Sequence, residues 1–383
     1  MALLVPVACM SSAASSDAAA SLCGPYLHVR QNLPVTPPAV NAAMDYASET
    51  IFGDVPDLVI KDWTRTDHTD NLIEFIVTLR TGDGSQEFSF WMAEGKGRED
   101  TPLHIVVHQT GLPLCAVFRD ATARAPNEKC TATAQEAPAP ISAYAQAGLA
   151  YVAFQASDLI HDSPAGSERE MIRLLGPKGA ETTGVIAVWV AGMRTVLTIL
   201  EAEFPDATFS AMGFSRHGKS ALLAAAIDSR IDAVVAHQSG FGGAALWRSS
   251  SGEGYNRVAT GEGLRDFSHW FHPDFRAKNP TDLSNMPFDQ HQLLAAIAPR
   301  RVILGTGLRD TWSDPVSSWC SAQFASSAWH VPAIQANASV SMRQTRANTS
   351  PATYVRPGGH GLRLEDHLAY VGMLGGTPSN EPE

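Results

Sequence analysis

The sequence predicts an α/β fold, a three-layer sandwich in which helices cover both faces of a mostly parallel central sheet, with long insertions. Two observations support this prediction. Short apolar runs alternate with longer helix-like stretches along most of the chain, which is the pattern of βαβ units. The 383 residues are 44% hydrophobic and only 17% charged, which supplies enough apolar side chains for a large buried core.

The first elements with a clear pattern form a β-hairpin. Residues 72–80 and 87–92 alternate between apolar and polar side chains, and the glycine-containing segment 81–85 joins them. An antiparallel hairpin is a common addition to a parallel sheet. We therefore expect a mixed sheet.

Six short apolar runs follow the hairpin, and each predicts a buried strand. They cover residues 103–107, 149–154, 208–212, 233–236, 302–305 and 353–355. Helix-like stretches lie between them at residues 183–203, 219–227 and 291–297. The long irregular regions at about 113–145 and 241–290 are expected to be functional insertions, because structureless loops of that length are unusual in a compact domain. We predict a single catalytic domain over residues 26–383.

The first 25 residues differ in composition from the rest of the chain. They begin with an apolar stretch and become rich in Ala and Ser, as the remains of a secretory signal would. Cys9, after Val7-Ala8, loosely resembles a lipoprotein cleavage site, and a disordered leader explains the same residues equally well. We exclude residues 1–25 from the fold and expect a secreted or periplasmic protein.

The composition and the five cysteines exclude several classes of function. The cysteines lack metal-ligand spacing, so no zinc site is expected. Cys115 and Cys130 are placed to bridge a surface excursion, as in an oxidising compartment, although unpaired thiols fit equally well. A net charge of −11 without a basic block argues against a nucleic-acid binder. No apolar run approaches the roughly 18 residues that cross a bilayer, so no membrane-spanning segment is expected.

Residues 208–227 carry the pattern of a nucleophile elbow, a tight turn from a strand to a helix. The turn reads GFSRHG at residues 213–218, and a helix of small and apolar residues follows. Such a turn presents a serine hydroxyl at the carboxyl edge of the sheet and needs small neighbours, here Gly213 and Gly218. The second glycine comes one residue later than in the common GxSxG form. Ser215 is the candidate nucleophile of an α/β-hydrolase fold.

A serine nucleophile needs a histidine base and a carboxylate that orients it, in the chain order Ser, acid, His. Asp310 lies on the loop after one predicted strand, and His360 lies among glycines after the last. Both loops reach the same sheet edge as Ser215. Asp314 is the alternative acid, but it precedes a proline and suits a turn.

Two other histidines compete with His360. His217 lies inside the elbow, and His291 lies in a helix-like stretch. A histidine chosen at random is more often structural, but the Gly-Gly-His-Gly setting of His360 after a terminal strand has no obvious structural reason. We favour His360 as the base.

Several motifs together resemble one known family. The elbow GFSRHGK at 213–219 looks like the GxSRxGK signature of glucuronoyl esterases, carbohydrate esterase family 15. Further runs agree with that family in order: QSGFGG at 238–243, HWF at 269–271, MPFDQHQLL at 286–294, IAPR at 297–300, DTWSDP at 310–315 and RPGGH at 356–360. The resemblance covers about residues 183–375.

The resemblance implies an α/β-hydrolase that cleaves the ester between a lignin alcohol and the 4-O-methyl-glucuronate of glucuronoxylan. Ser215 would attack the carbonyl, His360 would carry the proton, and Asp310 would stabilise the imidazolium. Arg216 would bind the oxyanion through its guanidinium. The family resemblance implies no metal and no organic cofactor, and we expect a monomer.

The resemblance also implies which residues bind the substrate. Lys219 and Glu253 would contact sugar hydroxyls, and Trp312 would lie beside the methoxy group. His269 and Trp270 belong to the matching HWF run and would line the same site. Without the family pattern, Lys219 would be a solvated lysine of a first helical turn and Trp312 a core residue.

Gln238 departs from the family pattern, because many members carry Glu at the matching position and some use it as the triad acid. A glutamine cannot stabilise an imidazolium by charge, so this chain depends on Asp310 or has reduced activity. The loop at residues 108–111 is expected to supply a second oxyanion donor.

Two alternative functions remain open. One is a general carboxylesterase or acetyl-xylan-type esterase on the same fold, which would cleave aryl acetates without depending on Lys219 or Glu253. The other is an inactive carbohydrate-binding relative, suggested by Gln238.

Overall fold

The computed structural model confirms the predicted α/β architecture. It describes residues 23–68, 71–82, 84–95, 101–119, 130–254, 267–277, 283, 285–331 and 350–375. In these residues nine strands form one sheet in the order β1-β2-β3-β5-β4-β6-β7-β8-β9. The leader residues 1–22 and part of each long insertion lie outside the described residues.

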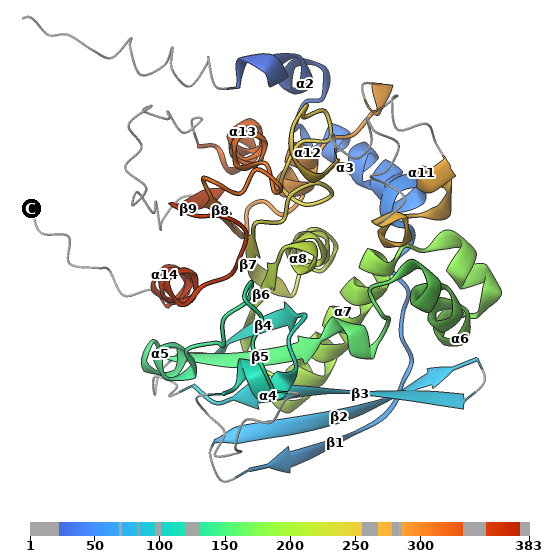
Figure 1. Ribbon diagram of the computed structural model, residues 1–383, viewed down its shortest axis with the longest axis vertical. Helices are drawn as coiled ribbons and strands as arrows, with labels where there is room; N and C mark the ends of the chain where they lie inside the picture. The colour runs from blue at the N-terminus through green and yellow to red at the C-terminus, as the bar shows by residue number, and fades with distance from the viewer. Residues whose placement is uncertain are drawn as a thin grey trace, which may run out of the picture.

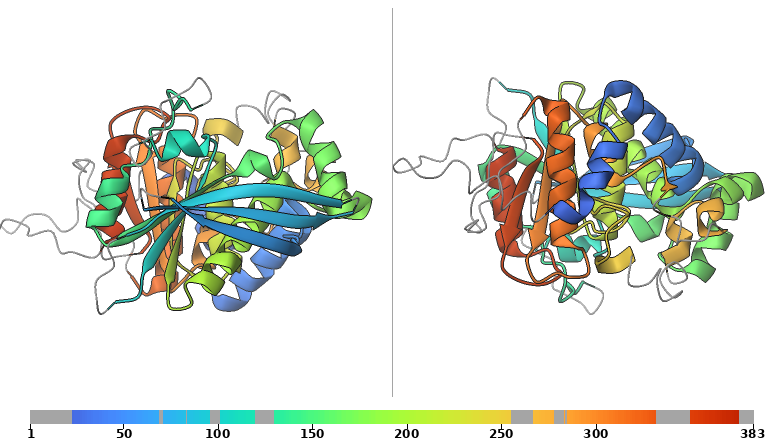
Figure 2. Two further views of the ribbon diagram at one scale, coloured as in Figure 1. Left: turned by 90° about the horizontal axis from the view of Figure 1, so that it is seen from below. Right: turned by 90° about the horizontal axis from the view of Figure 1, so that it is seen from above.

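The sheet is mixed, as predicted. Its antiparallel end contains β1 (Ile60–Asp67) and the hairpin of β2 (Leu72–Thr81) and β3 (Gly84–Ala93), and β3 pairs antiparallel with β5. The remaining neighbours are parallel. These parallel strands are β4 (His104–Thr110), β5 (Leu149–Gln155), β6 (Thr208–Phe214), β7 (Ile231–His237), β8 (Arg301–Gly307) and β9 (Ala352–Arg356). These three antiparallel strands, in blue, lie at the lower end of the molecule in Figure 1 and face the viewer in Figure 2, left.

Helices cover both faces of the sheet, as predicted (Figure 1). One face carries α3 (Pro37–Tyr46), α6 (Pro164–Thr182), α7 (Val185–Glu203), α8 (Arg216–Ile227) and α12 (Gln290–Ala295). The other face carries α4 (Leu114–Val117), α5 (Ile141–Gln146) and α14 (Leu364–Leu374). Beside α12 lies α13 (Pro315–Ala325), and shorter helices are α2 (Leu27–Asn32), η4 (Ser268–Trp270) and α11 (Pro273–Ala277).

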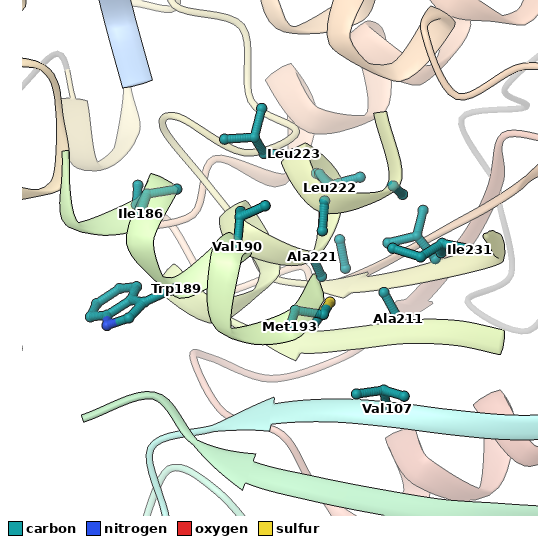
Figure 3. Close-up of a cluster of buried hydrophobic side chains, with 14 of the residues drawn as sticks. Val107, Ile186, Trp189, Val190, Met193, Ala211, Ala221, Leu222, Leu223 and Ile231 are labelled. Atoms are coloured by element: carbon teal, nitrogen blue, oxygen red, sulfur yellow. The ribbon is translucent and has the colours of Figure 1, made fainter. Parts of the chain in front are cut away.

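The largest core cluster lies between the sheet and helices α7 and α8 (Figure 3). Trp189, Val190 and Met193 of α7 pack with Leu222 of α8 above Val107 of β4. Because α7 meets the sheet on one side and α8 on another, it is apolar around most of its circumference. This packing fixes the start of α8 against the carboxyl edge of the sheet.

Helix α7 also corrects one expectation about membrane spans. Among the described residues it is the one helix long and apolar enough to cross a bilayer, although the sequence was expected to contain no such run. Of its most apolar 18-residue window, 78% is buried inside the protein. A largely buried core helix passes the same test of length and composition.

Two disulfides cross-link the described residues, one between cysteines 15 residues apart and one between cysteines 297 residues apart. Cys115 pairs with Cys130, which confirms the bridge considered from the sequence. Cys23 pairs with Cys320 in α13, a bridge that the sequence did not predict. Residues 23–25, which were expected to belong to the leader, are therefore tied to the folded chain through Cys23.

Candidate active site

Ser215 lies in a strained turn between β6 and α8. Its backbone has φ 57° and ψ −124°, a region that non-glycine residues seldom adopt. The turn is tight, because a Cβ at Gly213 would lie 2.1 Å from the carbonyl oxygen of His217, and one at Gly218 would lie 3.0 Å from a neighbouring side chain. The Ser215 N–H donates to the carbonyl of His237 at 2.8 Å. This is the geometry of the predicted elbow.

The structure brings His360 and Asp310 to Ser215. Ser215 Oγ lies 3.0 Å from His360 Nε2, and His360 Nδ1 lies 2.8 Å from Asp310 Oδ2. An ionised carboxylate only accepts hydrogen bonds, so Nδ1 donates to Asp310 and leaves Nε2 to accept the serine hydroxyl. The three side chains therefore form a hydrogen-bonded line in the tautomer that a general base needs.

Ser313 joins this line, although the sequence analysis did not single it out. Its N–H donates to Asp310 Oδ1 at 3.2 Å, and its hydroxyl lies 3.1 Å from His360 Nδ1 and donates to the Gln238 carbonyl at 3.0 Å. Burial would raise the pKa of the Asp310 carboxyl, but the hydrogen bonds from His360 and Ser313 and the charge of His360 outweigh burial and hold that pKa below its ordinary value. The one available signal for Ser313 was its position three residues after the acid.

The competing residues have other partners. Asp314 caps the N-terminus of α13, where its Oδ1 accepts a main-chain N–H at 3.1 Å. His291 is buried and binds a main-chain carbonyl at 2.7 Å, and His217 is buried beside a glutamine amide of β4. Across the described ranges, no group of three or more His, Cys, Asp or Glu is arranged to hold a metal ion. The pair at Ser215 is therefore Asp310 and His360.

A second carboxylate holds Arg216, the residue after Ser215. Arg216 Nε lies 2.6 Å from Asp162 Oδ2, and Asp162 Oδ1 accepts from His269 Nε2 at 2.8 Å and from Trp270 Nε1 at 2.7 Å. Burial would raise the pKa of Asp162, but the hydrogen bond from His269 and the charge of Arg216 lower it to about 2. The Arg216 side chain is 37% exposed.

His269 and Trp270 occupy a different place from the one expected. Both side chains are 4% exposed, and both donate to Asp162. The structure places them behind Arg216, where they support the carboxylate that holds the guanidinium, instead of on an open surface facing substrate. Asp162 was missed because it lies outside every motif of the sequence, and only a tertiary contact reveals it.

Lys219 also differs from the expected sugar contact. It is 1% exposed, and its ammonium donates to the carbonyls of Ser239 and Phe241 at 2.8 and 2.6 Å and to Glu253 Oε2 at 2.8 Å. Burial lowers the pKa of Lys219, and the Glu253 carboxylate opposes that shift. An ammonium has three N–H donors, so all three are used inside the protein. Lys219 and Glu253 form a buried pair that fixes the loop after β7.

Trp312 keeps the largest exposure among the five expected substrate-binding residues. It lies on the loop after β8, between Asp310 and Ser313. Its carbonyl accepts from the Glu253 N–H at 2.7 Å, and its ring makes an edge contact with Phe267 at 6.3 Å between centroids. The partly exposed ring thus stands beside the triad.

Among residues 108–111, where a second oxyanion donor is expected, the Gly111 N–H already has a partner. The Gly111 N–H is bonded to the buried carboxylate of Glu136, which also accepts from the Thr110 hydroxyl at 2.6 Å. Burial raises the pKa of Glu136 to about 7. A Cβ at Gly111 would lie 3.5 Å from Arg216 Nη2, so the guanidinium packs closely over this loop.

Comparison with known proteins places the chain in a family. Residues 120–332 match the family model described as glucuronyl esterase of fungi, and this match covers more than half of the 383 residues. The chain belongs to that family. The resemblance to glucuronoyl esterases seen in the motifs is confirmed.

Relatives of this family member include a prokaryotic and a fungal protein. Carbohydrate esterase MZ0003, from an unknown prokaryotic organism, is 30% identical over 192 residues, which are 49% of this chain and 43% of that protein. The 4-O-methyl-glucuronoyl methylesterase 1 of Phanerochaete chrysosporium is 29% identical over 180 residues, 45% of this chain and 38% of that protein. The matches therefore span less than half the length of these curated relatives.

A solved structure supports the fold. The structure of a glucuronoyl esterase of carbohydrate esterase family 15 from Teredinibacter turnerae aligns over 88% of this chain and 83% of that chain, with a TM-score of 0.66 and 24% identity. The predicted α/β-hydrolase fold is confirmed by this likeness.

Proposed function

We propose that this family member is a glucuronoyl esterase, a serine carboxylic ester hydrolase that cleaves the ester between the 4-O-methyl-glucuronate of glucuronoxylan and a lignin alcohol. The observation that carries the proposal is the hydrogen-bonded line of Ser215, His360 and Asp310 beside Arg216. The substrate class rests on the family and on the fungal relative, a 4-O-methyl-glucuronoyl methylesterase.

In the acylation half of the reaction, Ser215 Oγ attacks the carbonyl carbon of the ester while His360 Nε2 takes the hydroxyl proton. The Asp310 carboxylate stabilises the imidazolium that forms. Negative charge develops on the carbonyl oxygen, and we assign its stabilisation to the N–H groups at the start of α8 and to the Arg216 guanidinium. His360 then gives the proton to the departing alcohol, and the uronate stays on Ser215 as an ester.

In the deacylation half, a water molecule replaces the alcohol. His360 Nε2 takes a proton from the water as its oxygen attacks the acyl carbon. The second tetrahedral intermediate collapses, the Ser215 ester bond breaks, and His360 returns the proton to Ser215 Oγ. The products are the free uronic acid and the regenerated serine, so every proton taken by His360 is returned.

Sugar recognition depends on residues outside the triad. Trp312 has the exposure that a contact to the methoxy group needs. Lys219 would bind a sugar hydroxyl only if one of its three internal hydrogen bonds opened, whereas its 2.8 Å bond to Glu253 uses only Oε2 of that carboxylate. This burial favours the second candidate, a general carboxylesterase, because turnover of simple esters would not need a sugar contact from either residue.

The cellular setting follows from the disulfides. Two bridges, Cys23–Cys320 and Cys115–Cys130, fit an oxidising compartment. We place the protein outside the cytoplasm, secreted or periplasmic, where it acts as a monomer on glucuronoxylan. Cys9, the candidate lipid-anchor residue, lies outside the described residues.

The test compares wild type and Ser215→Ala on benzyl glucuronate and on 4-nitrophenyl acetate. We expect strong cleavage of the uronate ester that is lost in the variant. Cleavage of the acetate alone would keep the serine and move the function to a general carboxylesterase. No cleavage of either ester would contradict the proposed chemistry and favour an inactive carbohydrate-binding relative.

A further inference from the structure

Gln238, directly after β7, is held by both of its main-chain groups. Its N–H donates to the Gly305 carbonyl at 2.8 Å, and its carbonyl accepts from the Ser313 hydroxyl at 3.0 Å. The residue is 3% exposed and has φ 47°, the left-handed region that few residues with a long side chain adopt. A backbone held in this conformation indicates that the position of the side chain matters.

The Gln238 side chain bridges the two neighbours of His360. Its Nε2 donates to the Gly359 carbonyl at 3.1 Å, and its Oε1 accepts from the Gly361 N–H at 2.7 Å. The segment around His360 forms bends with no helix or strand ladder of its own, and its glycines give the backbone wide freedom. These two hydrogen bonds restrict that freedom on both sides of the histidine.

We propose that Gln238 is a positioning residue for His360. Its amide holds the loop so that Nε2 stays within reach of Ser215 while Nδ1 stays on Asp310. The inference rests on the roles proposed for these three side chains. In this proposal Gln238 takes the place of a charged residue. Its amide holds His360 in position through hydrogen bonds, whereas a carboxylate would stabilise the charged imidazolium.

The chemistry requires an amide. One bond needs a donor and the other an acceptor, and an ionised carboxylate only accepts. In Gln238→Glu one carboxylate oxygen would still accept from the Gly361 N–H, but the other would face the Gly359 carbonyl oxygen. When that carboxyl is protonated, its O–H can donate to Gly359 and restore the second bond.

The variant Gln238→Glu should therefore gain a pH dependence that wild type lacks. At high pH the new carboxylate repels the Gly359 carbonyl and removes one restraint on the loop, while Arg356 and His237 still bind the carbonyls of Gly359 and Gly361. As the pH falls, protonation of the carboxyl restores the bond and the activity relative to wild type. Burial of the site favours the neutral carboxyl, whereas the Arg356 guanidinium, which donates to the same Gly359 carbonyl at 3.3 Å, favours the ionised form, so these two effects together set the pH of the transition.

The experiment measures kcat and KM for 4-nitrophenyl acetate between pH 5 and 9 in wild type, Gln238→Glu and Gln238→Met. Gln238→Met keeps the approximate size of the side chain and removes both hydrogen bonds. The matched control is Gln86→Glu. Gln86 lies in the distant hairpin, is also buried, and donates to the main-chain carbonyls of Asp158 and Leu159 at 2.8 and 2.9 Å. Thermal unfolding of each variant shows whether a lower kcat comes from a destabilised fold or from a displaced His360 in a folded protein.

We expect Gln238→Met to lower kcat by about tenfold or more with KM within about twofold, in the range of supporting residues that orient a catalytic histidine. Gln238→Glu should show the same loss at pH 8 and recover relative to wild type toward pH 5. Gln86→Glu should change the unfolding temperature and leave kcat unchanged.

The inference is overturned if both Gln238 variants keep kcat within about twofold of wild type at every pH. It is also overturned if Gln238→Glu is more active than wild type at pH 8, because the carboxylate would then act on His360 as a second acid. The acetate tests only the serine and the histidine, so failure of wild type on glucuronate esters would contradict the proposed substrate and not this inference.

Discussion

The two sides of Ser215 are built differently. On the His360 side, Gln238, Asp310, Ser313 and His360 all lie within a few residues after β7, β8 or β9, which are neighbours in the sheet. The Arg216 side is assembled from the loops after β4 and β5 and from η4, where Glu136, Asp162, His269 and Trp270 gather around Arg216 from distant parts of the chain.

The difference shows which residues of the site are brought together by the order of the strands alone. Parallel strands end at one edge, so a polar residue just after each strand is brought close to the others by the backbone. The His360 side therefore follows once the strands are in place. The Arg216 side depends on how long loops pack, and there the structure places His269 and Trp270 in supporting positions that the sequence did not predict.

The largest expected effect is on kcat and comes from a substitution on the His360 side. Asp310→Asn should lower kcat about 10⁴-fold, equivalent to about 5.5 kcal/mol of transition-state stabilisation, because the amide favours the wrong histidine tautomer. The matched control is Asp314→Asn, which keeps an oxygen that can cap α13 and should change neither stability nor kcat appreciably, because Asn and Asp cap helices about equally well. If Asp314→Asn is the variant that loses activity, the acid is misassigned.

The next effect concerns the buried ion pair of Lys219 and Glu253, which fixes the loop after β7. Lys219→Met should lower the free energy of unfolding by about 3–5 kcal/mol, because it leaves the Glu253 carboxylate buried without its partner. Urea denaturation measures the loss, and the double variant Lys219→Met with Glu253→Leu should recover part of it. A small stability change together with a selective loss on uronate esters would instead assign Lys219 to the sugar.

A third effect is the pH dependence of stability that the buried carboxyl of Glu136, next to Gly111, should cause. Burial raises the pKa of Glu136 from 4.5 to about 7, so the folded protein holds the proton more tightly than the unfolded chain does. Stability is therefore lost as the pH rises from about 4.5 to 7, by about 3 kcal/mol. Glu136→Gln should match wild type at pH 4 and exceed it at pH 8 in urea denaturation. A difference that does not change with pH would contradict the raised pKa.

The smallest effect tests how Arg216 is held. Asp162→Asn removes the charge opposite the guanidinium while an amide oxygen can still accept from Trp270. We expect kcat to fall about tenfold to a hundredfold, less than removal of an oxyanion donor costs. Asp228→Asn is the control, because it weakens another arginine contact, with Arg230 at 2.7 Å, away from Ser215. Equal small losses in both variants would remove the positioning role of Asp162.

The parallel strands were predictable because each is a short, continuous apolar run buried on both faces. Strand β1 was not, because Ile60–Asp67 lies at the edge of the sheet and is mostly polar and exposed. Helix α6 was missed as well, since Gly176 and Pro177 interrupt its pattern with a kink.

In the site, the elbow and the two loops that carry Asp310 and His360 were predictable from local order along the chain. The partners of Arg216 and Lys219 were not, because a sequence does not show which donors are already used. Lys219 satisfies its three N–H groups inside the fold, and Asp162 acquires its role through contacts more than 50 residues away in sequence.

The most direct test of the account is the chemical identity of the nucleophile. Wild type and Ser215→Ala would be treated with a fluorophosphonate, and the modified peptide located by mass spectrometry. We predict one phosphonyl group per chain, on Ser215, and no labelling of the variant. Modification of another residue, or equal labelling of both proteins, would contradict the account.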